Sequence, residues 1–227
     1  MSIVYKGKEV PCIAEVVDGR TVKFRGQRCW WDLGEPGTRK RTQPIEVVVV
    51  HHTAGEGNAT AIHKTLRNRR TKGGQKGLAV HFTVDRDGRI VQQADLDTVC
   101  FHGGIQNGRS IGIETACSGW PHGKYTAAST KREVYQDVLR GKPHKYFKLF
   151  DEQLASLILL CQDLCDMFGL PRKFPRTADG KALRETLTPQ AALAHRGLIG
   201  HLQYASMKGD PPPYVMDEIM SALHPSV

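Results

Sequence analysis

Three side chains that together suit a zinc ion come from two distant parts of the chain. A run of four valines ends in His51 and His52, which is typical of a buried strand that leads into a histidine. Further along, His201, Lys208 and Asp210 fall within one loop that is closed by prolines. Two imidazoles and one carboxylate leave a fourth zinc position for water, as in catalytic rather than structural sites. The pattern predicts a zinc hydrolase with His51, His201 and Asp210 as ligands.

Each of these residues has a structural explanation when it is considered alone. Strand alternation places His51 and His52 on opposite faces, so only one of them is expected to face the metal. A histidine at the end of a strand is more often packed or hydrogen-bonded than a ligand, and it is the second segment that favours the metal. Lys208 could be an ordinary solvated lysine. Alternatively, its ammonium could stabilise the oxyanion that forms when water attacks a carbonyl.

Glu114 ends an apolar strand that we expect over residues 110–114. A carboxylate in that position is uncommon unless it is paired or functional. Near a metal it would take a proton from water and pass it to the leaving amine. A salt bridge to a neighbouring Arg or Lys is the structural alternative, and the spacing leaves both open.

Short apolar strands mixed with helices indicate an α/β fold, with a central sheet covered on its faces. We expect a strand over residues 45–51 and a hairpin over residues 79–93, with an Asp85–Gly88 turn. The expected helices span residues 59–70, 151–168 and 213–223, and a Gly-rich turn at 73–77 follows the first.

We divide the chain into an accessory segment, residues 1–44, and a main domain, residues 45–227. Two β-rich runs around Asp18-Gly19 predict a β-hairpin in the accessory segment. The segment is too short for a core of its own, so we expect it to pack on the main domain. Residues 119–149 and 171–195 are rich in Gly, Pro and charge, which predicts functional rims or poorly ordered loops.

The composition is that of a soluble globular protein, with 40% hydrophobic and 24% charged residues. No apolar run approaches the roughly 18 residues of a membrane span, so we expect no membrane insertion. The six cysteines show no C-x-x-C spacing and are expected to be reduced. The N-terminus lacks the apolar stretch of a secretory signal, so we expect synthesis in the cytoplasm.

The net charge of +9 is compatible with several anionic partners, including nucleic acid and cell-wall polymers. The basic residues are dispersed along the chain, and only 7% of residues are aromatic. No aromatic residues are interleaved with the basic clusters as a stacking platform would require. We therefore expect no nucleic-acid partner.

Five motifs in the same order resemble those of the zinc-dependent N-acetylmuramoyl-L-alanine amidases. That group includes phage lysozyme-type amidases, muropeptide-recycling amidases and peptidoglycan recognition proteins. The resemblance covers about residues 45–223 and implies a mixed, mostly parallel sheet flanked by helices, with zinc in a surface groove. The motifs are the run ending in His51-His-Thr, Val80-His-Phe-Thr-Val-Asp-Arg-Asp-Gly88, Phe101-His-Gly-Gly104, Ser110-Ile-Gly-Ile-Glu114, and Gly200-His with Lys208-Gly-Asp-Pro211.

The resemblance also implies roles for individual residues. His51, His201 and Asp210 correspond to the three zinc ligands, the last at a position where many members have Cys. Lys208 corresponds to the lysine that stabilises the transition state. Glu114 corresponds to the carboxylate that recycling-type members use as their base.

One departure from the family pattern bears on the proton carrier. Lysozyme-type members have a tyrosine where this chain has Val80, and its absence favours Glu114 in that role. His102 resembles a substrate contact that lines the cleft, although it could be an ordinary loop histidine. We also predict His52 and Thr53 as substrate-binding residues.

The implied reaction is hydrolysis of the amide between N-acetylmuramic acid and L-alanine, with Zn²⁺ as cofactor and peptidoglycan or a muropeptide as substrate. A basic chain without a leader suits a monomeric phage endolysin that reaches the cell wall after release at lysis. A cytoplasmic muropeptide-recycling amidase is the alternative. A non-catalytic peptidoglycan-binding module is a third possibility, which the complete ligand set disfavours.

Overall fold

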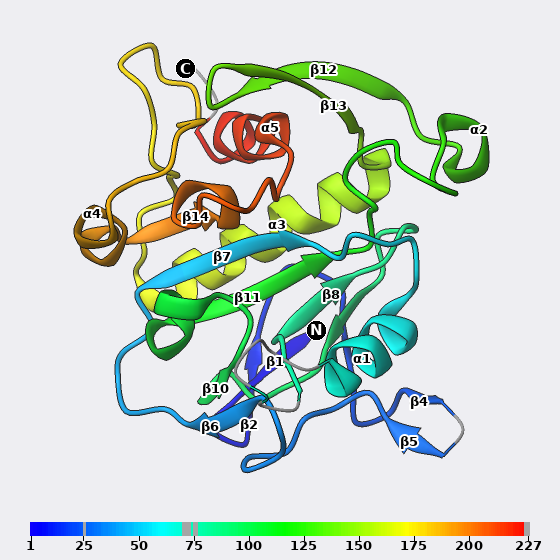
Figure 1. The fold of residues 1–227 in the computed structure, drawn as a ribbon. Helices are drawn as coiled ribbons and strands as arrows, with labels where there is room; N and C mark the ends of the chain where they lie inside the picture. The colour runs from blue at the N-terminus through cyan, green and yellow to red at the C-terminus, as the bar shows by residue number, and fades with distance from the viewer. Residues whose placement is uncertain (25, 70–73, 75–76, 225–227) are drawn as a thin grey trace.

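The computed structural model describes residues 1–24, 26–69, 74 and 77–224, and its centre is a six-stranded sheet (Figure 1). The strand order is β14-β7-β11-β8-β9-β3, and every neighbouring pair is parallel except β8–β9. This confirms the predicted mixed, mostly parallel sheet. The strands are β3 (Val16–Asp18), β7 (Val47–His52), β8 (Phe82–Val84), β9 (Ile90–Gln92), β11 (Ser110–Thr115) and β14 (Gly197–Gly200).

Helix α3 crosses behind the sheet in Figure 1 and covers one of its faces. Leu157 and Leu160 of α3 share a core with Val48 and Val50 of β7, because these side chains alternate toward the helix. None of the helices in the described ranges is long and apolar enough to cross a bilayer. The helices are α1 (Ala59–Asn68), α2 (Ala127–Thr130), α3 (Asp151–Phe168), α4 (Pro189–Ala194) and α5 (Pro213–Leu223), with the 3-10 turns η1 (Gly104–Arg109) and η2 (His201–Gln203).

Most of the predicted elements of the main domain are confirmed. Helices α3 and α5 have the expected bounds, and β8 pairs antiparallel with β9 as the hairpin predicts. Helix α1 ends at Asn68. The predicted end of this helix at Arg70, and most of the Gly-rich turn at 73–77, lie outside the described residues.

The hairpin predicted around Asp18-Gly19 is wrong. Its first run contributes β3, which pairs in parallel with β9 at the open edge of the main sheet. The second run forms a small hairpin with the residues that follow it. A different turn, Lys6-Gly7, joins two paired strands, and both of its residues have the positive φ that a tight hairpin turn requires. The small paired strands are β1 (Ser2–Tyr5) with β2 (Lys8–Pro11) and β4 (Lys23–Phe24) with β5 (Gln27–Arg28).

The N-terminal residues touch the main domain at several points. Strand β6 (Thr38–Lys40) pairs with β10 (Thr98–Cys100), and the Asp163 carboxylate of α3 accepts the backbone N–H groups of Ile13 and Ala14. A domain boundary at residue 44 stays a prediction.

Residues 119–149 are more ordered than the sequence predicts. They contain α2 and a hairpin of β12 (Val134–Leu139) and β13 (Lys142–Phe147), at the top of Figure 1. Their exposed, charged faces hide the apolar alternation by which a strand is usually detected. Tyr135 anchors the hairpin by packing edge-on against Tyr214 of α5, with ring centroids 4.6 Å apart. The stretch 171–195 contains only the short helix α4.

A buried ion pair fixes the base of this segment to the loop after β7. The Arg132 side chain is fully buried, and its Nε lies 3.0 Å from Glu56 Oε2. The same guanidinium donates to the carbonyls of Ala116 and Lys148 at 2.7 and 3.0 Å. The segment therefore fixes one rim of the region at the end of β7.

Replacing Arg132 should destabilise the fold strongly. Arg132→Met leaves the Glu56 carboxylate buried with its main partner removed, which costs about 3–5 kcal/mol in the free energy of unfolding. Urea unfolding at pH 7 measures this change. The neighbouring Glu133 is exposed, so Glu133→Gln should stay within about 0.5 kcal/mol of the wild type. Equal effects of the two substitutions would contradict the anchoring role.

Candidate metal centre

The carboxyl ends of three parallel strands meet at one edge of the sheet and bring distant residues together. Glu114 of β11 lies opposite His51 of β7, and Gly200 of β14 lies opposite Val50. Because His201 follows Gly200 directly, the pairing places His201 beside His51. Strand register alone therefore positions two of the predicted ligands and the predicted proton carrier.

His51, His201 and Asp210 converge as predicted. The His51 Nδ1 atom lies 3.0 Å from both His201 Nδ1 and Asp210 Oδ2, and the remaining side of this triangle, from His201 to Asp210, is 3.1 Å. All three residues are buried. The backbone N–H of Leu202 donates to the carbonyl of Asp210 at 2.7 Å, which closes the loop between the two ligands. Three donor atoms aimed at one point can hold a metal ion.

The electrostatics of the triangle favour metal binding. Burial, followed by the charge of His201, lowers the pKa of His51 to about 4. Burial alone would raise the pKa of Asp210, but His201 and His51 hold it well below the usual range. At neutral pH His51 is therefore a neutral imidazole and Asp210 is a carboxylate. These are the protonation states that bind metal.

Glu114 offers a carboxyl oxygen with no assigned contact. Its Oε2 is buried and has no hydrogen-bond partner within the part of the chain that the structure describes, so this oxygen forms no salt bridge there. Burial raises the pKa of Glu114 to about 8; the carboxylate of Asp210 adds to the effect, and Lys208 opposes it. Buried polar atoms in a folded protein are nearly always hydrogen-bonded, to protein groups or to ordered water. The role of Glu114 as base stays a prediction.

All the predicted site residues line one cavity of about 740 Å³. This arrangement puts them within reach of a single ligand, although the roles of Lys208 and the substrate-binding residues stay predictions. Lys208 is exposed at the cavity wall. The residues are His51, His52, Thr53, His102, Glu114, His201, Lys208 and Asp210.

His52 and Thr53 shape the loop that follows β7. His52 Nδ1 accepts the N–H of Ala54 at 3.1 Å, and its ring packs edge-on against Trp120. The Thr53 hydroxyl donates to the carbonyl of Gly55 at 2.7 Å. The alternation predicted for the two histidines is confirmed, since only His51 belongs to the metal cluster.

His102 makes a contact that the sequence did not reveal. Its Nδ1 lies 3.0 Å from His51 Nε2, and its Nε2 lies 3.2 Å from the Ser110 hydroxyl. A partner on the second ring nitrogen orients a metal-binding histidine. The sequence feature that could have pointed to this contact is Gly112. A Cβ at this position would come within 2.6 Å of the His102 ring, so only glycine leaves room for the ring.

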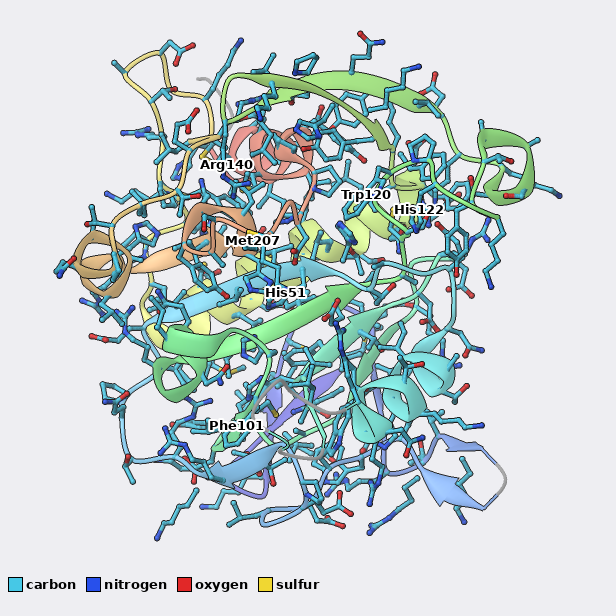
Figure 2. The ribbon with its side chains drawn as sticks, in the orientation of Figure 1. His51, Phe101, Trp120, His122, Arg140 and Met207 are labelled. Atoms are coloured by element: carbon cyan, nitrogen blue, oxygen red, sulfur yellow. The ribbon has the colours of Figure 1, made fainter. Side chains whose placement is uncertain are left out.

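Several cavity residues have no motif in the sequence. Trp120 and Met207 lie at the rim, above His51 in Figure 2, and are 40% and 94% exposed. Arg69 and Tyr125 also line the cavity. Trp120 lies in the stretch that we predicted to form a functional rim or a poorly ordered loop, but nothing in its spacing singled it out.

Comparison with known proteins gives a match to one protein family. A family model described as N-acetylmuramoyl-L-alanine amidase matches residues 41–213. No curated protein matches the chain in sequence.

Several solved structures are similar to this chain at low sequence identity. Drosophila PGRP-LB is 14% identical, with a TM-score of 0.53 over 93% of this chain and 95% of that one. The amidase LysC from Clostridium intestinale URNW is 16% identical, with a TM-score of 0.49 over 92% and 97%. AmiD from E. coli, in complex with anhydro-N-acetylmuramic acid-L-Ala-D-gamma-Glu-L-Lys, is 19% identical, with a TM-score of 0.45 over 74% of this chain. The match covers 52% of AmiD, so this chain spans about half its length.

Metal binding should stabilise the fold through Asp210. A divalent metal at about 100 times its Kd adds about 2.7 kcal/mol to the free energy of unfolding. Thermal unfolding with and without added zinc should show this gain in the wild type and not in Asp210→Ala. Glu114→Ala is the matched control, because it removes a nearby carboxylate that is not a donor. A gain that persists in Asp210→Ala would contradict the assignment.

Proposed function

The chain belongs to the N-acetylmuramoyl-L-alanine amidase family, and on that premise we propose that it is a zinc enzyme that hydrolyses the amide between N-acetylmuramic acid and L-alanine in peptidoglycan. The observation that carries the proposal is the triangle of donor atoms from His51, His201 and Asp210. The triangle lies in a cavity that is also lined by Glu114, whose Oε2 has no hydrogen-bond partner in the described part of the chain.

The donor set fits zinc in both chemistry and spacing. Two imidazole nitrogens and a carboxylate oxygen are common ligands of catalytic zinc. Tetrahedral ligands at about 2.0 Å from zinc lie about 3.3 Å from one another. The donor atoms here are 3.0–3.1 Å apart, close to that value.

The surrounding residues supply the remaining chemistry. His51, His201 and Asp210 would hold the zinc ion, which would supply Lewis acidity that polarises a carbonyl and lowers the pKa of water toward about 7. Glu114 accepts a proton from the attacking water at its buried Oε2 and returns it to the alanine nitrogen as the C–N bond breaks. The Lys208 ammonium, in the same cavity, stabilises the oxygen that gains negative charge.

Removing either residue should slow turnover without removing the metal. Glu114→Ala and Lys208→Ala should each lower kcat by roughly 100-fold or more and still bind one zinc. The assay counts new alanine N-termini released from purified peptidoglycan. Lys181 is exposed and does not line the cavity, so Lys181→Ala should keep full activity. Full activity in Glu114→Ala or Lys208→Ala would remove that residue from the mechanism.

We further propose that the substrate is the assembled cell wall, as for an endolysin. The net charge of +9 favours approach to an anionic wall. A second groove of about 660 Å³ shares Trp120 and Lys208 with the first cavity, and Lys142 and Lys145 of β13 also line it. These cations extend the positive surface beyond the metal centre.

The choice of substrate tests this role. The enzyme should release alanine N-termini faster from intact sacculi than from soluble anhydro-muropeptides at equal stem-peptide concentration. Raising the ionic strength should slow the reaction on sacculi more, because salt screens the attraction between exposed charges. The opposite preference would favour a muropeptide-recycling amidase. Binding to sacculi without new N-termini would favour a non-catalytic module.

A further inference from the structure

Arg140 connects the β12–β13 hairpin to the loop between the two metal ligands His201 and Asp210. Its Nη2 lies within hydrogen-bonding distance of three backbone carbonyls of this loop: 2.8 Å from that of Leu202, 3.3 Å from that of Ala205 and 2.8 Å from that of Lys208. One guanidinium thus contacts the loop near its start, its middle and its end.

The apex of this 201–210 loop has little packing to hold it. Ser206, Met207 and Lys208 are exposed, and Met207 is 94% exposed. Because His201 and Asp210 are the ends of the loop, a shift of the backbone between them would move a donor atom or the Lys208 side chain. Backbone contacts to Arg140 take the place of side-chain packing at the apex. Figure 2 shows Met207 between His51 and Arg140 in this view.

The turn that carries Arg140 is itself anchored. The Arg140 N–H donates to the carbonyl of Arg184 at 3.3 Å, and its Nε donates to the Thr186 hydroxyl at 2.9 Å. Arg184 in turn pairs with Asp137 of β12 at 3.1 Å and with Asp217 of α5 at 2.7 Å. The guanidinium of Arg140 is therefore held on a folded support, as a group that positions a site must be.

From these contacts we propose that Arg140 is a positioning residue for the metal centre. It fixes the backbone of the 201–210 loop so that Asp210 and His201 meet His51 and Lys208 faces the cavity. Its effect on turnover rests on the proposed function, whereas its effect on metal affinity needs only the donor triangle. Arg140 belongs to the 119–149 segment, whose role the sequence left unassigned.

The experiment measures zinc affinity and turnover in Arg140→Met. Competition with a chelator of known affinity should show zinc binding weakened by about 10-fold, the effect expected for a residue that supports metal ligands. Turnover should fall by about 10-fold with KM little changed, because the loop is misplaced while the residues that bind the substrate are all still present. In a Lys208→Ala background the further loss of kcat should be smaller, since part of the effect acts through that lysine.

Three variants separate positioning from general loosening of the hairpin. Arg184→Met removes the ion pairs of the hairpin but leaves the loop contacts, and Lys142→Met removes a charge from the same hairpin. Arg184→Met weakens the support of the turn that carries Arg140, so it should cost less zinc affinity than Arg140→Met, and Lys142→Met should stay within about 2-fold of the wild type. Arg140→Lys, with one donor group, should fall between the wild type and Arg140→Met. Arg140→Lys also serves as the test if Arg140→Met does not fold.

Two results would overturn the inference. One is unchanged zinc affinity in the folded Arg140 variants, and the other is an equal loss in Arg184→Met. If the wild type binds zinc but releases no alanine N-termini, the proposed function is wrong. The inference about Arg140 is still tested in that case, because zinc affinity reports whether Arg140 positions the loop.

Discussion

The parallel pairing of β7 with β14 on one side and β11 on the other determines the geometry of the metal centre. Val48 and Val50 face α3 and pack in its core, which leaves His51 on the opposite face with the buried Val47 and Val49. Because both faces of β7 carry valines, a slip of one residue would exchange two apolar faces and turn the His51 imidazole toward the α3 core. The observed register keeps this imidazole out of that core and places Glu114 opposite His51.

The third donor of the triangle, Asp210, depends on a different kind of constraint. Asp210 lies outside the sheet, on a loop that returns from η2 toward α5. Its position relies on hydrogen bonds, including the one from Leu202, and on contacts from the 119–149 segment through Arg140. The same segment also contacts the loop after β7 through Arg132 and Glu56, and Glu56 lines the cavity. One stretch of chain thus supports two parts of the cavity wall.

The elements that the sequence predicted well are those specified by local patterns. Helix α3 has leucines at helical spacing and a glycine stop, and β7 is a short apolar run, so each needs no knowledge of its neighbours. The metal donors were predictable because their residue types restrict the chemistry and their motifs keep a family order. The convergence of His51 and His201 required only that two parallel strands pair, whereas Asp210 also depends on the loop that carries it.

The elements that were missed depend on contacts between distant residues. Strand β3 pairs with β9 because that edge of the sheet is open, which no local pattern around Asp18-Gly19 encodes. The β12–β13 hairpin is too exposed and charged to show an apolar alternation. The contact between His102 and His51 depends on the space left by Gly112, a feature of packing rather than of spacing.

The two carboxyl groups of the centre have opposite electrostatic environments, as the roles that we propose for them require. His201 and His51 keep Asp210 ionised, as a metal ligand must be. Glu114 is buried, its Oε2 has no hydrogen-bond partner among the described residues, and its pKa is raised to about 8. Pairs of titratable groups whose environments push their pKa values apart mark the division between a fixed charge and a proton carrier. A divalent cation at the triangle would lower the pKa of Glu114 toward neutral pH, because an opposite charge favours the carboxylate. The same cation that Asp210 binds would therefore prepare Glu114 to accept a proton.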